Sequence, residues 1–210
     1  MKVRSGTFRP GRIRALAALP LLVMAGAGLS ACDTKVGTAA VINGHKITES
    51  DLNSYLTSSV QPVPGNNGSV PARFFALSIL VNREIGPNLV AAAGEKPTPA
   101  QEAQARKAIS DSATTNGIEG QLSKLGFAPK FYQAYLDEQT QVSLLGAKVT
   151  SAQQLAGVVK KAGLNVSVNP RYGGWDARTL SLTEVGKKQL PNALTLGTTL
   201  PGDATASPTP

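Results

Sequence analysis

The sequence predicts one mainly α-helical domain that carries a small β-sheet, and three observations support this fold class. The chain has 210 residues, of which 41% are hydrophobic, enough for one compact domain with a modest core. Apolar residues recur at helical spacing through the middle of the chain. Strand-like segments stand only near its two ends, over residues 39–48 and 164–168.

The first of these end segments is expected to form a hairpin that leads into a helix. Its short arms flank Asn43-Gly44, the dipeptide that accepts the positive φ angles of a type I′ turn. Thr48 then stands as the N-cap of a helix over about 49–58, with Asp51 three residues on in a capping-box position. The proline- and glycine-rich residues 61–71 are expected to hold no regular element.

The middle of the chain is expected to be helical. A segment that begins at Ala72 is apolar on nearly all sides, which indicates a core helix, and Gly86-Pro87 should bend or break it. Later segments open with a threonine or proline and mostly end at glycine, as helices do. The ranges expected for these later helices are 98–114, 118–125, 129–145 and 150–163.

The second end segment, residues 164–168, alternates as a strand and is stopped by Asn169-Pro170. A lone strand is not stable, so we expect it to pair with the hairpin at 39–48 and bring the two ends of the domain together. Beyond residue 190 the chain is rich in Pro, Thr, Gly, Ala and Ser, which predicts a disordered tail over 191–210. The domain itself is expected to span residues 39–190.

The first 31 residues have the features of a secretory leader. Residues 1–14 are basic and residues 15–29 are apolar, a run shorter than the roughly 20 residues that span a membrane. Five of the 21 basic residues and no acidic residue lie in this leader, so 16 basic and 13 acidic residues remain after it and the formal charge falls from +8 to +3. The high overall charge therefore gives little support to nucleic-acid binding.

The leader ends in Leu29-Ser30-Ala31-Cys32, which resembles the bacterial lipobox. This resemblance implies that the Cys32 thiol carries a diacylglyceryl group, that palmitate-like chains hold the protein at the outer face of the cytoplasmic membrane, and that residues 32–38 are a tether. Cys32 is the sole cysteine, so no internal disulfide and no cysteine-based metal site can form. We expect no metal and no cofactor.

Both ends of the domain resemble exported foldases of the SurA and PrsA class. Residues 41–52 match a V-N-G-x-x-I-T-x-x-D hairpin, and residues 166–176 match a strand followed by an N-P-R-Y-G-x-W-D turn. A parvulin-type prolyl isomerase domain is commonly inserted in that family, but here only the few residues near 146–150 stand at the corresponding place, and the chain has one histidine. The resemblance implies a SurA N-terminal-like chaperone module without the isomerase.

The function expected from this resemblance is the binding of unfolded or partly folded exported polypeptides, without catalysis. Apolar and aromatic residues on the helices are candidates for client contact, although burial in the core is the favoured explanation for each of them. These candidates are Phe74, Phe75, Leu77, Phe131, Tyr132 and Tyr135.

A second candidate contact surface is the turn near the C-terminal end of the domain. It consists of Arg171, Tyr172, Trp175 and Asp176, but the sole Trp of a small domain usually packs on the core. The rival function is a structural or interaction lipoprotein that binds one folded envelope partner.

No group of residues predicts a catalytic site. His45 has no cysteine or second histidine to bind a metal with, and we expect it to be an exposed turn residue. Asp137 and Glu138 are adjacent on a helix and point to different sides, so they cannot act as a facing acid and base, and both are expected to be solvated. No phosphate-binding loop is present in the sequence.

Overall fold

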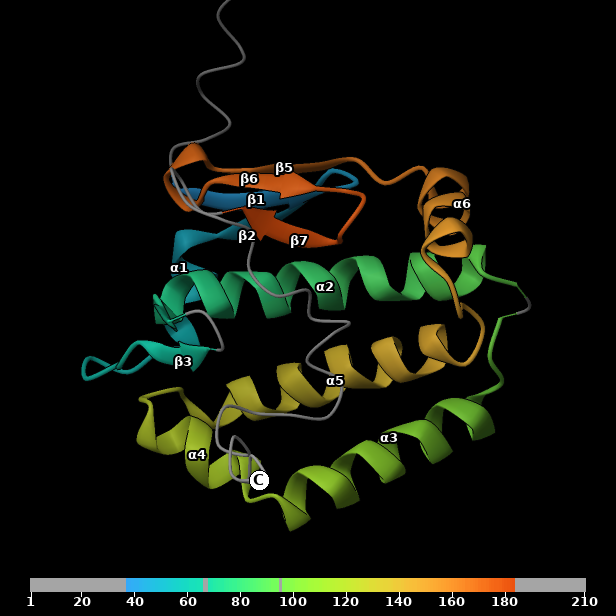
Figure 1. Cartoon of the computed structure of the whole chain (residues 1–210). Coiled ribbons are helices and arrows are strands. Elements are labelled where there is room, and N and C mark those ends of the chain that lie inside the picture. The colour runs from blue at the N-terminus through green and yellow to red at the C-terminus, as the bar shows by residue number, and fades with distance from the viewer. Residues whose placement is uncertain (1–36, 66–67, 95, 184–210) are drawn as a thin grey trace, which may run out of the picture.

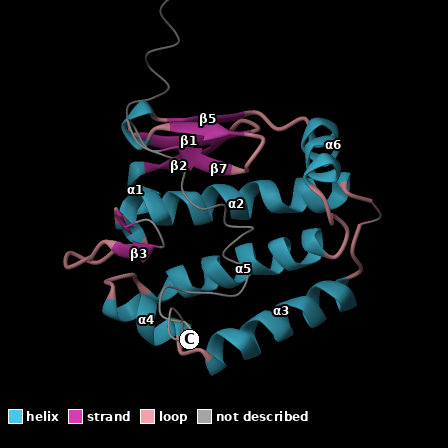
Figure 2. Cartoon of the chain, viewed as in Figure 1, coloured by secondary structure: helices cyan, strands magenta, loops and turns pink. Residues whose placement is uncertain are grey.

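The fold is described by a computed structural model over residues 37–183, with gaps at 66–67 and 95. It is mainly α-helical with small antiparallel sheets, as Figure 2 shows, so the predicted fold class is confirmed at this level. The helices are α1 Glu49–Ser54, α2 Ala72–Ala92, α3 Pro99–Thr115, α4 Ile118–Lys124, α5 Pro129–Gly146 and α6 Ala152–Ala162. The strands are β1 Thr38–Ile42, β2 His45–Thr48, β3 Val63–Gly65, β4 Gly68–Val70, β5 Val166–Val168, β6 Gly174–Asp176 and β7 Ser181–Thr183.

The elements are stacked in layers (Figure 1). The sheet made by β2, β1 and β5 covers one side of α2, and α5 packs on the other side of α2, followed by α3. Helix α6 packs against α2, and α4 connects α3 to α5. Because α2 contacts the sheet, α5 and α6, it is buried on several faces, and Leu77, Ile79, Val81 and Ile85 are almost completely inaccessible. The apolar character of this segment on nearly all sides therefore predicted the central helix correctly.

The predicted pairing of the two ends of the domain is confirmed. Strand order is β2-β1-β5, with β5 antiparallel to β1, and Ala40 and Ile42 face Val168 and Val166 in the register. Side-chain amides extend the pairing at both ends of β5. Asn165 N donates to Asn43 Oδ1 at 2.9 Å. At the other end, the Asn169 Nδ2 group donates to the carbonyl of Thr38 at 2.9 Å.

The predicted start of the domain is also confirmed in its local geometry. Asn43 and Gly44 have φ angles of 49° and 86°, as the hairpin turn requires. The Thr48 hydroxyl accepts from the backbone N–H of Asp51, and the Asp51 carboxylate accepts from the backbone N–H of Thr48, which is a complete capping box. Helix α1 ends at Ser54, earlier than the expected end near residue 58.

Of the bend or break expected at Gly86-Pro87, the break is wrong, because α2 continues through both residues to Ala92. Proline removes one backbone hydrogen bond, but packing against α5 holds the helix on both sides of it. Gly86 has a different role: a Cβ atom there would lie 2.6 Å from the Cβ atom of Gln141 on α5. The glycine therefore allows the backbones of α2 and α5 to approach closely where they cross.

Two short hairpins differ from the sequence predictions. β3 and β4 pair within the expected loop 61–71, because both strands of a two-stranded ribbon are edges and an edge strand tolerates Pro64. The expected turn itself holds a short 3₁₀ helix over Pro170–Tyr172 and then the strand β6, which pairs with β7, so its residues 174–176 are a strand and not a turn. Helix α6 is capped by Ser151, one residue after the predicted cap, and ends at Gly163 as predicted.

The leader 1–31, Cys32, nearly all of the tether, and the tail 191–210 lie outside the described residues. Within the residues that are described, none of the helices has the length and apolar character that a membrane span requires.

Candidate functional site

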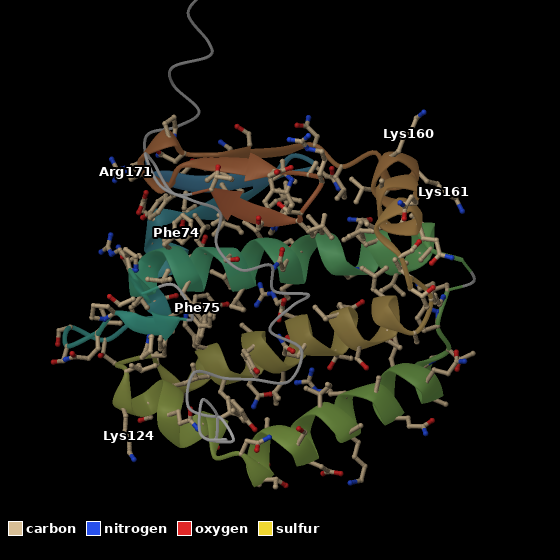
Figure 3. All side chains as sticks on the ribbon, viewed as in Figure 1. Phe74, Phe75, Lys124, Lys160, Lys161 and Arg171 are labelled. Atoms are coloured by element: carbon tan, nitrogen blue, oxygen red, sulfur yellow. The ribbon has the colours of Figure 1, made fainter. Side chains whose placement is uncertain are left out.

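The residues that were candidates for client contact lie mostly in the core. Phe74, Leu77, Phe131 and Tyr132 are all buried, whereas Phe75 and Tyr135 are partly exposed. Figure 3 shows Phe74 on the side of α2 that faces the sheet and Phe75 on the side that faces α5. The folded domain therefore does not present these residues as one apolar surface, and the core explanation that the sequence favoured describes four of the six.

An aromatic cluster explains the positions of several of these side chains. Phe127 and Phe131 stack with ring centroids 4.4 Å apart, and Phe75 contacts both of them at 5.8 and 6.0 Å. Tyr55 meets Phe131 edge-on at 6.2 Å. Rings in these geometries stabilise the packing beyond their buried area, so the cluster fixes the segment after α1 against α2 and α5.

The second set of candidates lies at the C-terminal turn. Two of its residues bind Glu49 at the start of α1 and so hold the turn against that helix. The buried Tyr172 hydroxyl donates to Glu49 Oε2 at 2.7 Å, and Arg171 Nη1 lies 3.5 Å from Glu49 Oε1. Asp176 Oδ1 accepts from the backbone N–H of Arg178, and Trp175 packs on the core while partly exposed. These contacts fit the structural explanation, although the exposed Arg171 points outward in Figure 3.

The expectation that both carboxylates of Asp137-Glu138 are solvated is wrong for Glu138. Both residues lie on α5. Asp137 is partly exposed and pairs with Arg106, whereas the side chain of Glu138 is completely buried. Glu138 Oε2 accepts from Gln139 Nε2 at 2.7 Å, and burial raises the pKa of Glu138 to about 7, against the opposing effect of hydrogen bonds from Gln139 and Asn82. Adjacent residues of a helix point in different directions, which explains why the Asp137 carboxylate contacts solvent and the Glu138 carboxylate is buried.

A concave polar surface lies where the hairpin, α1, α2 and the start of α5 meet. We call it the hairpin cleft, and its volume is about 300 Å³, at the small end of the range for ligand pockets. Its lining comes from the consecutive elements β2 and α1 and from α2 and α5, which lie further along the chain. The lining residues are His45, Lys46, Ile47, Asp51, Ser54, Tyr55, Leu80, Arg83, Glu84 and Lys130.

Tyr55 organises the floor of the hairpin cleft. Its hydroxyl accepts from Arg83 Nη1 at 3.3 Å, and Lys130 Nζ lies 4.4 Å above the centre of its ring. Such a cation over an aromatic face is attracted by the ring electrons. Arg83 Nη2 also donates to Glu84 Oε1 at 3.2 Å, so the guanidinium group is held from two sides.

The remaining charges of the hairpin cleft are unevenly compensated. The Asp51 carboxylate is engaged by Thr48, whose side-chain and backbone hydrogen bonds lower the pKa of Asp51. Glu84 is engaged by Arg83 and lies 3.6 Å from His45 Nδ1. Lys130 donates to the neutral hydroxyl of Ser54. Among the described residues, neither Lys46 nor Lys130 forms an ion pair with a carboxylate.

Sequence reasoning did not find the hairpin cleft. His45 is exposed, as predicted, but no pattern along the chain indicates that it lies beside Glu84, 39 positions later. Lys130 comes from yet another segment, so no spacing along the chain marks the group. Over the described residues no three His, Cys, Asp or Glu side chains come together as metal ligands.

Comparison with family models, with curated proteins and with solved structures gives no match to the chain.

Proposed function

We propose that the chain is a lipid-anchored extracytoplasmic chaperone-like protein that binds unfolded or partly folded exported polypeptides without isomerising prolyl bonds. The observation that supports this proposal is the shared sheet of β1, β2 and β5. The two segments that resemble the foldase family lie at opposite ends of the domain sequence, and the resemblance implies that they meet. They pair along β1, which is the arrangement the proposal requires.

The place of client contact follows from burial. Since most of the aromatic candidates are in the core, the folded domain offers the hairpin cleft as its concave contact surface. Binding at a polar cleft uses backbone and charged groups, so each contact is weak and release needs no energy source. Weak reversible binding suits a protein that holds polypeptides only until they fold.

The proposal is tested by aggregation of an unfolded client. The full chain is reconstituted in phosphatidylcholine vesicles and mixed with reduced lysozyme, and the sedimented client is measured after low-speed centrifugation. We expect the sedimented fraction to fall at near-stoichiometric ratios of chain to client. Empty vesicles, and vesicles with added serum albumin, are the controls, and equal sedimentation in all three samples would reject the proposal.

The rival function is distinguished by the proteins that co-purify with the chain. Pull-down from solubilised membranes should yield a spread of exported polypeptides in unfolded form. A single dominant folded partner would instead establish a dedicated interaction lipoprotein.

A further inference from the structure

We propose that the hairpin cleft binds an extended, acidic polypeptide segment as an added strand on β2. This inference rests on the proposed function and specifies the partner and the way in which it is bound. Three features carry it: a sheet edge that none of the described strands pairs with, two lysines of the cleft that form no ion pair among the described residues, and the cleft itself.

The free edge is that of β2. Among the strands that the structure describes, β2 pairs with β1 and with no other, so one side of β2 is not paired by any of them. In a hairpin with a two-residue turn, the residues that flank the turn, here Ile42 and His45, exchange hydrogen bonds with each other. The next residue, Lys46, therefore turns its backbone N–H and C=O groups outward, where an extended chain can pair with them.

The hairpin cleft lies along this edge, because His45, Lys46 and Ile47 of β2 all contribute to its lining. Ile47 is buried and faces the core, so the groups that β2 offers to a ligand are its outer backbone and the exposed side chains of His45 and Lys46. Helices α1 and α2 form the opposite wall. An open sheet edge beside such a wall is the kind of surface on which an extended chain binds as an added strand.

The charge of the hairpin cleft selects the kind of strand. The lining of the hairpin cleft includes three Lys or Arg residues and two carboxylates, and both carboxylates are already engaged, Asp51 by Thr48 and Glu84 by Arg83. Among the residues described, neither Lys46 nor Lys130 has an ion-pair partner, although Lys130 lies close enough to Asp51 to contribute to the lowered pKa of that carboxyl. An acidic side chain on the added strand supplies that partner, and a basic side chain is repelled.

Binding is measured with the full chain in mild nonionic detergent by fluorescence anisotropy of labelled eight-residue peptides. The peptides share one alternating Val/Thr frame and differ only in carrying Glu, Gln or Lys at two positions. We expect the Glu peptide to bind at least about 10-fold more tightly than the Lys peptide, and more weakly as salt is raised. Equal binding of the three peptides overturns the proposal.

The site is located by two matched double variants. Lys46→Gln/Lys130→Gln should weaken binding of the Glu peptide by about 5- to 10-fold, since each exposed charge pair contributes modestly. Lys160→Gln/Lys161→Gln makes the same change in net charge on α6, whose lysines project away from the body in Figure 3, and should leave the affinity within about twofold. Equal losses in both variants would mean nonspecific charge attraction and would overturn the proposal.

Strand addition is tested separately by N-methylation of the Glu peptide. Methyl groups on the amides of alternate residues should abolish binding in one of the two alternating sets and spare it in the other, because an edge strand uses every second amide. The same loss in both sets overturns the proposal. If reduced lysozyme is still kept soluble in that case, the proposed function stands and only the acidic-strand inference fails.

Discussion

Replacing Glu138 by glutamine is expected to remove a pH dependence from the stability of the domain. Glu138 is completely buried, and burial raises its pKa from 4.5 to about 7. That difference corresponds to about 3 kcal/mol, at about 1.4 kcal/mol for each pH unit. Because the folded state holds the proton more tightly than the unfolded state, the stability of the wild-type chain should fall as pH rises from 4.5 to 7.

The assay is urea unfolding of the wild-type chain and of Glu138→Gln at pH 5, 6, 7 and 8. The wild-type chain should lose about 2 to 3 kcal/mol over this range, and the variant should lose little and exceed the wild type at pH 8. Glutamine keeps the size of the side chain and an oxygen that accepts from Gln139. Glu119→Gln, at an exposed position on α4, is the matched control and should keep the wild-type slope.

The Asp51 carboxylate also has a shifted pKa, and its shift acts in the opposite direction. Hydrogen bonds from Thr48 lower the pKa of Asp51 below 3.8, so Asp51 adds stability that is lost only as pH falls below that value. This effect lies outside the range of the assay. If Glu138→Gln keeps the wild-type slope between pH 5 and 8, the buried carboxylate is not its source and the reasoning is refuted.

Three further predictions concern the stability of the domain and its lipid anchor. Gly126→Ala should lower the free energy of unfolding in urea by at least about 2 kcal/mol, since Gly126 has a φ of 85° and a Cβ there would lie 2.6 Å from the backbone of Val60. The matched control is Gly120→Ala on the open face of α4, which should be neutral or stabilising. Tyr172→Phe should cost about 1 to 2 kcal/mol, because the Glu49 carboxylate loses its 2.7 Å hydrogen bond; a stability equal to wild type would contradict the role of this contact. Cys32→Ala should move the chain from the membrane to the soluble fraction and abolish labelling with palmitate, and a variant that stays membrane-bound would exclude the thiol as the anchor.

The parts of the fold that follow from local chemistry were predictable from the sequence. Asn43-Gly44 specifies the hairpin turn, and Thr48 with Asp51 specifies the start of α1, because each signal acts over two to four residues. The pairing of β1 with β5 was also predictable, since the lone strand at 164–168 needed a partner and the hairpin at 39–48 was the other strand segment expected in the domain.

The remaining features depend on which segments pack together. Gly86-Pro87 signals a break, but contact with α5 keeps α2 continuous, so tertiary packing overrides the local preference. The burial of Glu138 depends in the same way on its neighbours in the fold. The hairpin cleft was beyond sequence reasoning because β2, α1, α2 and α5 each supply part of it.

The pairing of β1 with β5 also determines when the domain can finish folding. The hydrogen bond between Asn43 and Asn165 joins residues 122 positions apart, and the one between Thr38 and Asn169 joins residues 131 positions apart. A ribosome releases the N-terminal hairpin long before it makes the strand that completes the sheet. Until then the inner strand keeps an open side, and closing so long a loop carries an entropic cost that slows the last step. A truncated chain that ends before Val166 would lack β5, so the edge of β1 would be free to pair with other nascent chains.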